Sequence, residues 1–186
     1  MEDQQIDQED TRPFLSYYVK PHNKISREVT EADMDRVLKD AHILYNLCFV
    51  QHGPYPAAVA MAHSQIDDQD PLRFFVTADK RVIINPVITN KTKTPVYLAE
   101  GCMSFPMMPA VRTARSHKIT VDYDTLSREE ESIIHVKDAQ FSGREAQMFQ
   151  HELGHFDGEW LFPIESWKPL PEEKVGVEDG EATIKL

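Results

Sequence analysis

The segment His-Glu-Leu-Gly-His at residues 151–155 constrains the fold of this chain more than any other feature. Residues four positions apart share one face of an α-helix, so His151 and His155 can bind a single divalent ion if the segment is helical. Apolar residues around the segment recur at helical spacing: Ala146, Met148, Phe149, Leu153 and Phe156. Gly158 is suited to end such a helix. Glu152 would then lie where it can take a proton from a water molecule that the ion activates.

A catalytic metal site needs a third protein ligand. The metzincin pattern places a histidine six residues after the second one, but this position is Leu161, which cannot bind a metal ion. The glutamates that follow lie in an acidic, proline-rich tail that we expect to be poorly ordered: Glu172, Glu173 and Glu178. Cys102 is the better candidate, because it follows a strand-like stretch and lies in a loop that can present its thiolate. We therefore favour a Cys-His-His set; two surface histidines on an ordinary amphipathic helix are the alternative.

These segments resemble two signatures of the peptide deformylase family. Residues 100–104 read E-G-C-M-S where the family has E-G-C-L-S, and residues 150–155 read Q-H-E-L-G-H where the family has Q-H-E-x-x-H. Residues 82–86 are similar to the family's strand leading into an asparagine-proline turn. The resemblance spans about residues 25–165. It implies an α+β fold with short antiparallel β-sheets around a central helix that carries H-E-x-x-H.

The family's first signature, G-x-G-x-A-A-P-Q, falls on residues 58–65, where the chain departs from it. Ala58 and Ala60 replace the two glycines, and His63 and Ser64 replace the Ala-Pro pair. Alanine tolerates close approach of a ligand less well than glycine, so we expect a narrower or differently shaped substrate channel. For His63 we favour a buried histidine hydrogen-bonded to the backbone over a polar group near the metal or a substrate contact.

The resemblance implies a metal ion held by Cys102, His151 and His155. One thiolate and two imidazoles suit iron(II) or zinc(II), and nickel and cobalt are also compatible. Glu152 is implied as the general base, which later delivers its proton to the departing amine. The side-chain amide of Gln65 and the backbone N–H of Met103 are implied as the other catalytic groups, donors to the tetrahedral oxyanion.

The resemblance also implies where a peptide would bind. Val59 and Gly101 would offer backbone groups to an extended peptide that pairs with an exposed strand edge. Three side chains are candidates for an apolar pocket that receives the methionine side chain, with ordinary core packing as the alternative: Met61, Met148 and Phe149.

Two acidic residues near the ligands have a structural and a functional interpretation. Glu100 can orient Arg112 or Arg115 near the metal loop, or form a surface ion pair of little energetic consequence. Asp157 can accept the free ring N–H of a ligand histidine, but we favour a solvated aspartate at the helix end.

The chain has 186 residues, enough for a substantial core. We expect a disordered acidic tail at 1–12, a single catalytic domain at 13–165 and a Pro/Glu-rich tail at 166–186. The net charge of −11 argues against general nucleic-acid binding, and no apolar run is long enough to span a membrane. The acidic start resembles neither a secretory signal nor a transit peptide, and a thiolate ligand prefers a reducing compartment, which favours the cytoplasm.

The elements that we expect are a capped helix and several short strands. Thr30 followed by Asp33 predicts a helix start, and the apolar spacing continues to about Cys48, which we expect in the core. Strands are expected at 73–77, 81–84, 96–99 and 118–123, with 131–136 as the hairpin partner of the last. Helix, strands and then the motif helix give an α+β fold.

The resemblance implies hydrolysis of the N-formyl group from N-formylmethionyl peptides of nascent proteins, with release of formate. A nascent chain still associated with the ribosome is a possible form of that substrate. A related metallo-amidase with altered acyl or peptide specificity is the first alternative, because the first signature has changed most. The second is an inactive, deformylase-like binding protein. The joint presence of Cys102, Glu152 and Gln65 argues against it, since a structural metal site needs neither a base nor an oxyanion donor.

Overall fold

The structure is a computed structural model that describes residues 19–49, 58–106, 108–126, 133–168, 175–178 and 181–184. The predicted tail at residues 1–12 lies outside these ranges. The α-helices are α1 (Met34–Phe49) and α2 (Gly143–Phe156), and the 3₁₀ turns are η2 (Glu31–Asp33), η3 (His63–Gln65) and η4 (Ile164–Ser166). The strands are β1 (Ala60–Ala62), β2 (Phe74–Thr77), β3 (Val82–Lys91), β4 (Pro95–Glu100), β5 (Val111–Ser116), β6 (Lys118–Leu126), β7 (Ile133–Ser142), β8 (Val175–Glu178) and β9 (Glu181–Ile184).

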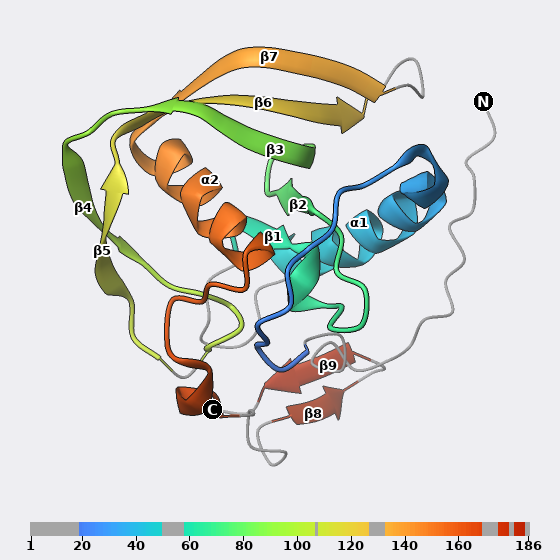
Figure 1. The fold of residues 1–186 in the computed structure, drawn as a ribbon. Coiled ribbons are helices and arrows are strands. Elements are labelled where there is room, and N and C mark those ends of the chain that lie inside the picture. Colours follow the sequence, from blue (N-terminus) through green and yellow to red (C-terminus); the bar gives the residue numbers. More distant parts are fainter. Residues whose placement is uncertain are drawn as a thin grey trace.

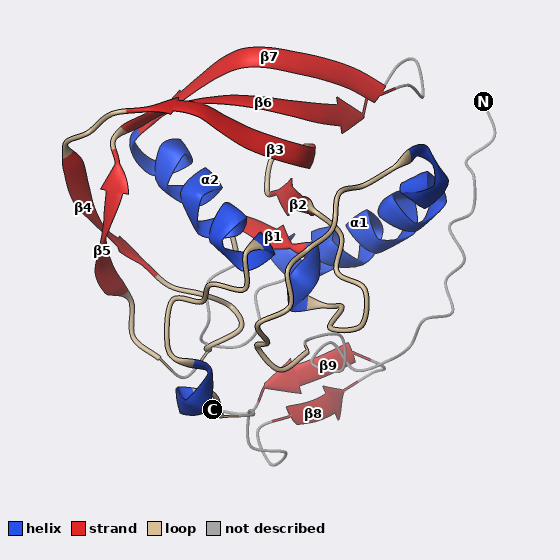
Figure 2. Cartoon of the chain, viewed as in Figure 1, coloured by secondary structure: helices blue, strands red, loops and turns tan. Residues whose placement is uncertain are grey.

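The main sheet has five antiparallel strands in the order β1-β2-β3-β6-β7, so β1 and β7 are its edges. Strands β4 and β5 form a separate antiparallel pair, which lies beside α2 (Figure 1). Figure 2 shows the two helices against the short strands β1 and β2 in the centre of the molecule. The predicted α+β fold with short antiparallel sheets around the motif helix is confirmed.

Alternate residues of β1, β2 and β3 pack against different helices. Met61, Phe74 and Val76 belong to the core cluster that includes α1, whereas Ala60 and Phe75 belong to the cluster that includes α2. Successive side chains of a strand point to opposite faces, so helices on both faces require apolar residues at every position. The continuous apolar runs of β2 and the start of β3 follow from this arrangement.

Helix α1 begins as the sequence predicts. The Asp33 carboxylate accepts hydrogen bonds from the backbone N–H and the hydroxyl of Thr30, at 2.9 and 2.7 Å, and one 3₁₀ turn leads into the helix. Cys48 lies fully buried near the other end, in the apolar core, as expected.

Helix α2 ends in a Schellman motif. The Glu159 N–H donates to the Gly154 carbonyl at 2.8 Å, the Gly158 N–H donates to the His155 carbonyl at 3.3 Å, and Gly158 has φ +70°. A Cβ on Gly158 would lie 3.0 Å from the backbone of Asn23, so glycine is needed there for both reasons. Gly158 therefore ends the motif helix, as the sequence predicts.

The strands extend further than the sequence predicts. β3 continues through the expected Asn-Pro turn as a bulge: Asn85 has φ 47°, and its side chain binds the backbone N–H and carbonyl of Val29. β7 is the predicted hairpin partner of β6, but it runs on to Ser142. The sequence interpretation missed β1 and β5, and it also missed the β8–β9 hairpin within the tail that we expected to be poorly ordered.

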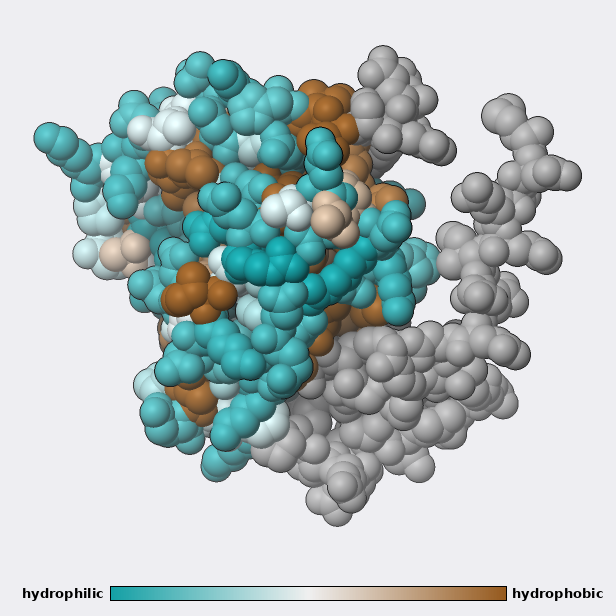
Figure 3. Space-filling view, turned by 45° about the vertical axis from the view of Figure 1, so that its right-hand side comes forward, coloured by the Kyte–Doolittle hydropathy of each residue, from teal (hydrophilic) through white to brown (hydrophobic). Residues whose placement is uncertain are grey.

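Exposed large apolar side chains are scattered over the described surface. The face shown in Figure 3 is mostly hydrophilic, with small separate apolar patches. In the part of the chain that the structure describes, no helix combines the length and the apolar character that a membrane crossing requires.

Candidate metal centre

Cys102, His151 and His155 come together from a loop and one face of α2. Their ligand atoms all lie within 4.8 Å of one another. The Nε2 atoms of the two histidines are 3.2 Å apart, and Cys102 Sγ lies 3.5 Å from His155 Nε2. A tetrahedral ion with bonds of about 2.1 Å to nitrogen and 2.3 Å to sulfur separates such ligand atoms by about 3.4 and 3.6 Å. The three side chains therefore fit one divalent ion.

Both imidazoles are oriented with Nε2 toward the cluster by acceptors at Nδ1. The Nδ1 of His151 lies 3.0 Å from a Glu100 carboxylate oxygen, and the Nδ1 of His155 lies 3.2 Å from the Glu159 carbonyl oxygen. An acceptor at Nδ1 assigns the proton to that nitrogen and leaves the Nε2 lone pair for a metal ion. The Glu159 carbonyl takes this position because the Schellman motif turns the chain back at Gly158.

The surroundings of the cluster favour positive charge at one histidine and neutrality at the other. Burial disfavours a charged His151, but hydrogen bonds with Cys102 and Glu100 outweigh it and raise the pKa of His151 to about 10. Burial and the neighbouring His151 hold the pKa of His155 well below its usual value. Anionic groups that draw a proton to His151 would equally favour a cation among the three ligand atoms.

Glu152 is buried beside the cluster, and one of its carboxylate oxygens, Oε2, has no hydrogen-bond partner among the described residues. Burial raises the pKa of Glu152 to about 7, against the opposing effect of His151. A carboxylate with a pKa near neutrality and a free oxygen is suited to accept and return a proton.

Gln65 presents its amide nitrogen to the same site. Its Oε1 accepts the backbone N–H of Ala62 at 2.9 Å, which fixes the amide so that Nε2 faces the Cys102 loop. Nε2 lies 3.0 Å from the hydroxyl oxygen of Ser104 and 4.0 Å from Cys102 Sγ. The backbone N–H of Met103 has no acceptor among the described residues. Two donors thus lie next to the cluster.

The residues expected to bind the peptide backbone lie at open positions. Val59 is 66% exposed and precedes the edge strand β1. Its carbonyl accepts the Ala78 N–H at 2.8 Å, while its own N–H has no acceptor among the described residues. Gly101 is exposed, and a Cβ added there would meet nothing within 4 Å.

The predicted side-chain pocket is less open. Met61 and Phe149 are fully buried in the two core clusters, and Met148 is partly buried against the α2 cluster. Ala60 belongs to the α2 cluster and is 7% exposed. The Ala60 side chain therefore packs in the core, and the expected narrower or differently shaped channel stays a prediction.

Three sequence hypotheses about nearby residues are decided by the contacts. Glu100 pairs with Arg115 at 3.0 Å and is buried, so the pair is no surface contact, and Glu100 also holds His151. Asp157 is exposed and pairs with Arg73 at 3.0 Å, so it is not the acceptor of a ligand histidine. His63 is buried and accepts the Leu72 backbone N–H at 2.9 Å, as favoured.

Other contributors were missed because they come from distant parts of the chain. The Thr113 hydroxyl donates to Glu100. The ring of Trp160 lies 4.6 Å from that of His155, centroid to centroid, and its indole N–H donates to the His22 carbonyl. These contacts join residues that are far apart in the sequence, so no local spacing predicts them. The acidic type of Glu100 and the aromatic type of Trp160 were the only indications that the sequence offered.

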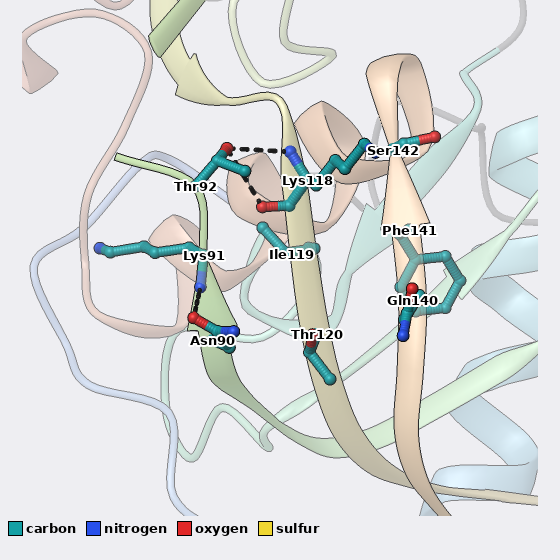
Figure 4. Close-up of a pocket in the computed structure, with 9 residues that line it drawn as sticks. All are labelled: Asn90, Lys91, Thr92, Lys118, Ile119, Thr120, Gln140, Phe141 and Ser142. Atoms are coloured by element: carbon teal, nitrogen blue, oxygen red, sulfur yellow. Dashed lines mark hydrogen bonds between the residues drawn. The ribbon is translucent and has the colours of Figure 1, made fainter. Parts of the chain in front are cut away.

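A separate open concavity of about 500 Å³ lies at the ends of β3, β6 and β7 (Figure 4). It is lined by nine residues: Asn90, Lys91, Thr92, Lys118, Ile119, Thr120, Gln140, Phe141 and Ser142. None of them is a predicted site residue. The convergent chemistry lies at the metal cluster, and we place the candidate active site there.

A family model described as polypeptide deformylase matches residues 9–166 of the chain. A peptide deformylase from Wolbachia sp. subsp. Brugia malayi (strain TRS) is 27% identical over 158 residues, which cover 78% of this chain and 84% of the relative. A peptide deformylase from Thermus thermophilus is 31% identical over 118 residues, which cover 63% of this chain and 56% of the relative.

The solved structures that resemble this chain include peptide deformylases as well. The crystal structure of a peptide deformylase from Thermotoga maritima is similar with a TM-score of 0.57 and 25% identity, and the match covers 79% of this chain and 90% of that one. The enzyme of a Vibrio parahaemolyticus bacteriophage, in complex with actinonin, has a TM-score of 0.56 and 25% identity, with 76% and 93% covered.

Proposed function

The chain belongs to the polypeptide deformylase family, and we propose that it releases formate from N-formylmethionyl peptides with the groups gathered around Cys102. Removal of the formyl group from nascent peptides is the reaction of this family of metallohydrolases. The observation that carries the assignment of residues is the orientation of both imidazoles, with Nδ1 bonded outward and Nε2 directed into the cluster.

A divalent ion held by Cys102, His151 and His155 would activate a water molecule and polarise the formyl carbonyl. Glu152 takes a proton from the water as it attacks the formyl carbon, using the oxygen that has no hydrogen-bond partner among the described residues. The C–N bond then breaks, and Glu152 returns the proton to the departing amine nitrogen. The products are formate and a peptide with a free N-terminus.

Negative charge develops on the formyl oxygen during the attack. The amide of Gln65 and the backbone N–H of Met103 donate to this oxygen in our proposal. Gln65 is suited to the role because Ala62 holds its carbonyl oxygen, so the amide cannot turn its acceptor toward the developing charge. One such donor contributes about 10²–10³ in kcat in other hydrolases.

The peptide would extend from the site along the open edge of β1. The N–H of Val59, which has no acceptor among the described residues, and the backbone of Gly101 lie at open positions where an added strand can bind. The methionine side chain would lie beside Met148, which is partly buried against the α2 cluster, whereas Met61 is fully buried in the α1 cluster on the opposite face of the sheet. The catalytic unit that we propose runs over residues 13–165, close to the range that the family model matches.

The native metal in this proposal is iron(II) or zinc(II). A thiolate ligand is preserved in a reducing compartment such as the cytoplasm. The test is formate release from formyl-Met-Ala-Ser by protein stripped with a chelator and reconstituted anaerobically with iron(II), zinc(II), nickel(II) or cobalt(II). We expect no release without metal and recovery at one ion per chain. An ion that binds at this stoichiometry without formate release from any formyl peptide would contradict the proposal.

Acetyl-Met-Ala-Ser is the matched substrate for acyl specificity. We expect release from the formyl peptide only. Release of acetate at a comparable rate would identify the chain as an amidase of altered acyl specificity.

A further inference from the structure

We propose that His63 and Asp40 form a positioning pair that holds the Gln65 amide at the oxyanion, a role that rests on the proposed function of Gln65. The pair connects turn η3, which carries Gln65, to helix α1, which contributes no residue to the cluster.

The hydrogen bonds of His63 assign the proton on its ring. Nδ1 lies 2.9 Å from the Leu72 backbone nitrogen, and a backbone N–H can only donate, so Nδ1 is the acceptor. Nε2 lies 3.0 Å from a carboxylate oxygen of Asp40, so Nε2 carries the proton and donates it. The ring is fully buried and lies 4.8 Å from the Phe74 ring, centroid to centroid. Both nitrogens and one ring face are therefore fixed.

The turn that His63 starts is short and lies just beyond an edge strand. β1 ends at Ala62, and the sheet no longer supports the backbone after that residue. The His63 carbonyl accepts the N–H groups of Ile66 and Asp67, at 3.0 and 3.1 Å, which closes the turn on itself. His63 is the first residue of the turn and lies two residues before Gln65. Its side chain therefore connects the start of the turn to the rest of the domain.

Asp40 is itself held in place by charge. Arg36, one helical turn earlier, lies 3.5 Å from Asp40 and also binds Asp67 and Asp70 at 2.5 and 2.7 Å. The anchor of η3 thus lies on α1 and on the loop that follows the turn. On the other side, the Ser64 carbonyl oxygen lies 3.1 Å from His22 Nε2, and the Ser64 hydroxyl lies 3.4 Å from the His155 carbonyl oxygen.

The experiment is a double-mutant cycle on the metal-loaded enzyme, with kcat and KM for formyl-Met-Ala-Ser. Gln65→Ala alone should lower kcat by about 10²–10³-fold. His63→Ala alone should lower kcat by about 10–100-fold at little change in KM, because misplacement by about 1 Å has such effects. In the Gln65→Ala background, His63→Ala should lower kcat no further, since the group that it positions is gone.

Conservative variants show which contact matters. His63→Gln can still donate to Asp40 and should recover part of the lost kcat, and Asp40→Asn, which keeps an acceptor, should be milder than Asp40→Ala. His42→Ala is the matched control, because His42 is exposed on the same helix. It should leave kcat unchanged.

A merely structural role predicts a different pattern. If His63→Ala lowers kcat equally in the wild-type and Gln65→Ala backgrounds, or if it leaves kcat unchanged while lowering Tm, the positioning role is overturned. If Gln65→Ala itself leaves kcat unchanged, the proposed donor role of Gln65 fails, which is a separate result. Metal content measured for every variant excludes loss of the ion as the cause.

Discussion

Helices α1 and α2 cover opposite faces of the same three strands, and they bury different chemistry. The buried face of α1 is apolar: Val37, Ala41, Leu44, Leu47 and Cys48. The buried face of α2 includes three polar groups among its apolar residues: Gln147, Glu152 and His155. Buried polar groups cost stability unless they are hydrogen-bonded. Gln147 donates to the Leu98 carbonyl, and His155 donates through Nδ1 to the Glu159 carbonyl. Glu152, by contrast, has a carboxylate oxygen with no hydrogen-bond partner among the described residues.

The difference indicates that the two helices have separate roles, one in stability and one in the reaction. The apolar face of α1 contributes stability by burial alone, whereas α2 holds groups in place at some cost in stability. Substitutions on the apolar face of α1, which does not include Asp40, should therefore change folding and leave the reaction intact. Substitutions on α2 and its loop partner should do the reverse.

The two cysteines give the sharpest test. Cys102→Ala should abolish metal binding and formate release, because two histidines remain as the only ligands. Cys48→Ala should keep both and lose about 1 kcal/mol of stability, as expected for a small cavity. Metal analysis and formate release measure the first pair of outcomes, and urea unfolding measures the stability.

Thiol labelling provides an independent readout of the same pair. Burial, with Glu152 nearby, raises the pKa of the Cys48 thiol, so this residue should resist alkylation in the folded protein. Cys102 should be alkylated after chelation and protected by bound metal. Equal labelling of both cysteines in the folded protein after chelation would contradict the contrast.

Glu152→Gln should lower kcat by about 10²–10⁴-fold while metal content is unchanged. The variant should also be more stable than the metal-free wild type at pH 8. Burial raises the folded-state pKa of Glu152 to about 7, so the wild type loses stability as the pH rises from about 4.5 to 7, and the variant does not. Urea unfolding across this pH range tests the second part. Asp35→Asn, at an exposed site on α1, is the control and should change neither quantity.

Leu44→Ala should destabilise the protein by about 2–5 kcal/mol, because Leu44 is fully buried in the α1 cluster. Its kcat should stay within about twofold of wild type at temperatures where the variant is folded. A large fall in kcat for a folded, metal-loaded variant would show that the core beneath α1 and the site on α2 are coupled. It would contradict the separate roles of the two helices.

Ala60→Gly restores the glycine of the family signature and should cost about 1–2 kcal/mol of stability, through lost methyl burial and greater freedom of the unfolded chain. The Ala60 methyl packs in the α2 cluster, so the peptide edge should be unchanged and KM should stay the same. A lower KM for longer formyl peptides would show that the methyl group does narrow the channel.

The sequence predicted the parts of the molecule that depend on short spacing. The i, i+4 histidines, Gly158 and the Thr30–Asp33 start all follow from local helix geometry, and the structure places them as expected. Contacts between segments that are distant in the sequence could not be predicted from local spacing. The tie from His63 to Asp40 spans 23 residues, and the Glu159 carbonyl reaches His155 only because of how α2 ends.

The direction of the Ala60 side chain could not be predicted for a related reason. The family pattern says that glycine is usual at the position, but the direction of an added methyl depends on strand register. β1 pairs with β2 so that Ala60 faces α2, and β1 itself is too short to be recognised from alternation.

The smallest predicted effect concerns the charges at the start of α1. A hydrogen bond from the Arg27 guanidinium, with others from Thr30, holds the pKa of Asp33 well below its usual range. A depressed folded-state pKa means that the carboxylate stabilises the fold above its unfolded pKa of about 4, and that this contribution is lost as the pH falls below it. Asp33→Asn should therefore cost up to about 1 kcal/mol at pH 7. The difference should shrink steadily in thermal unfolding below about pH 4. Because Arg27 and Asp33 bond to none of the cluster residues among the described contacts, kcat should not change. A loss of kcat would mean that the ionic contacts of α1 reach the active site through more than His63.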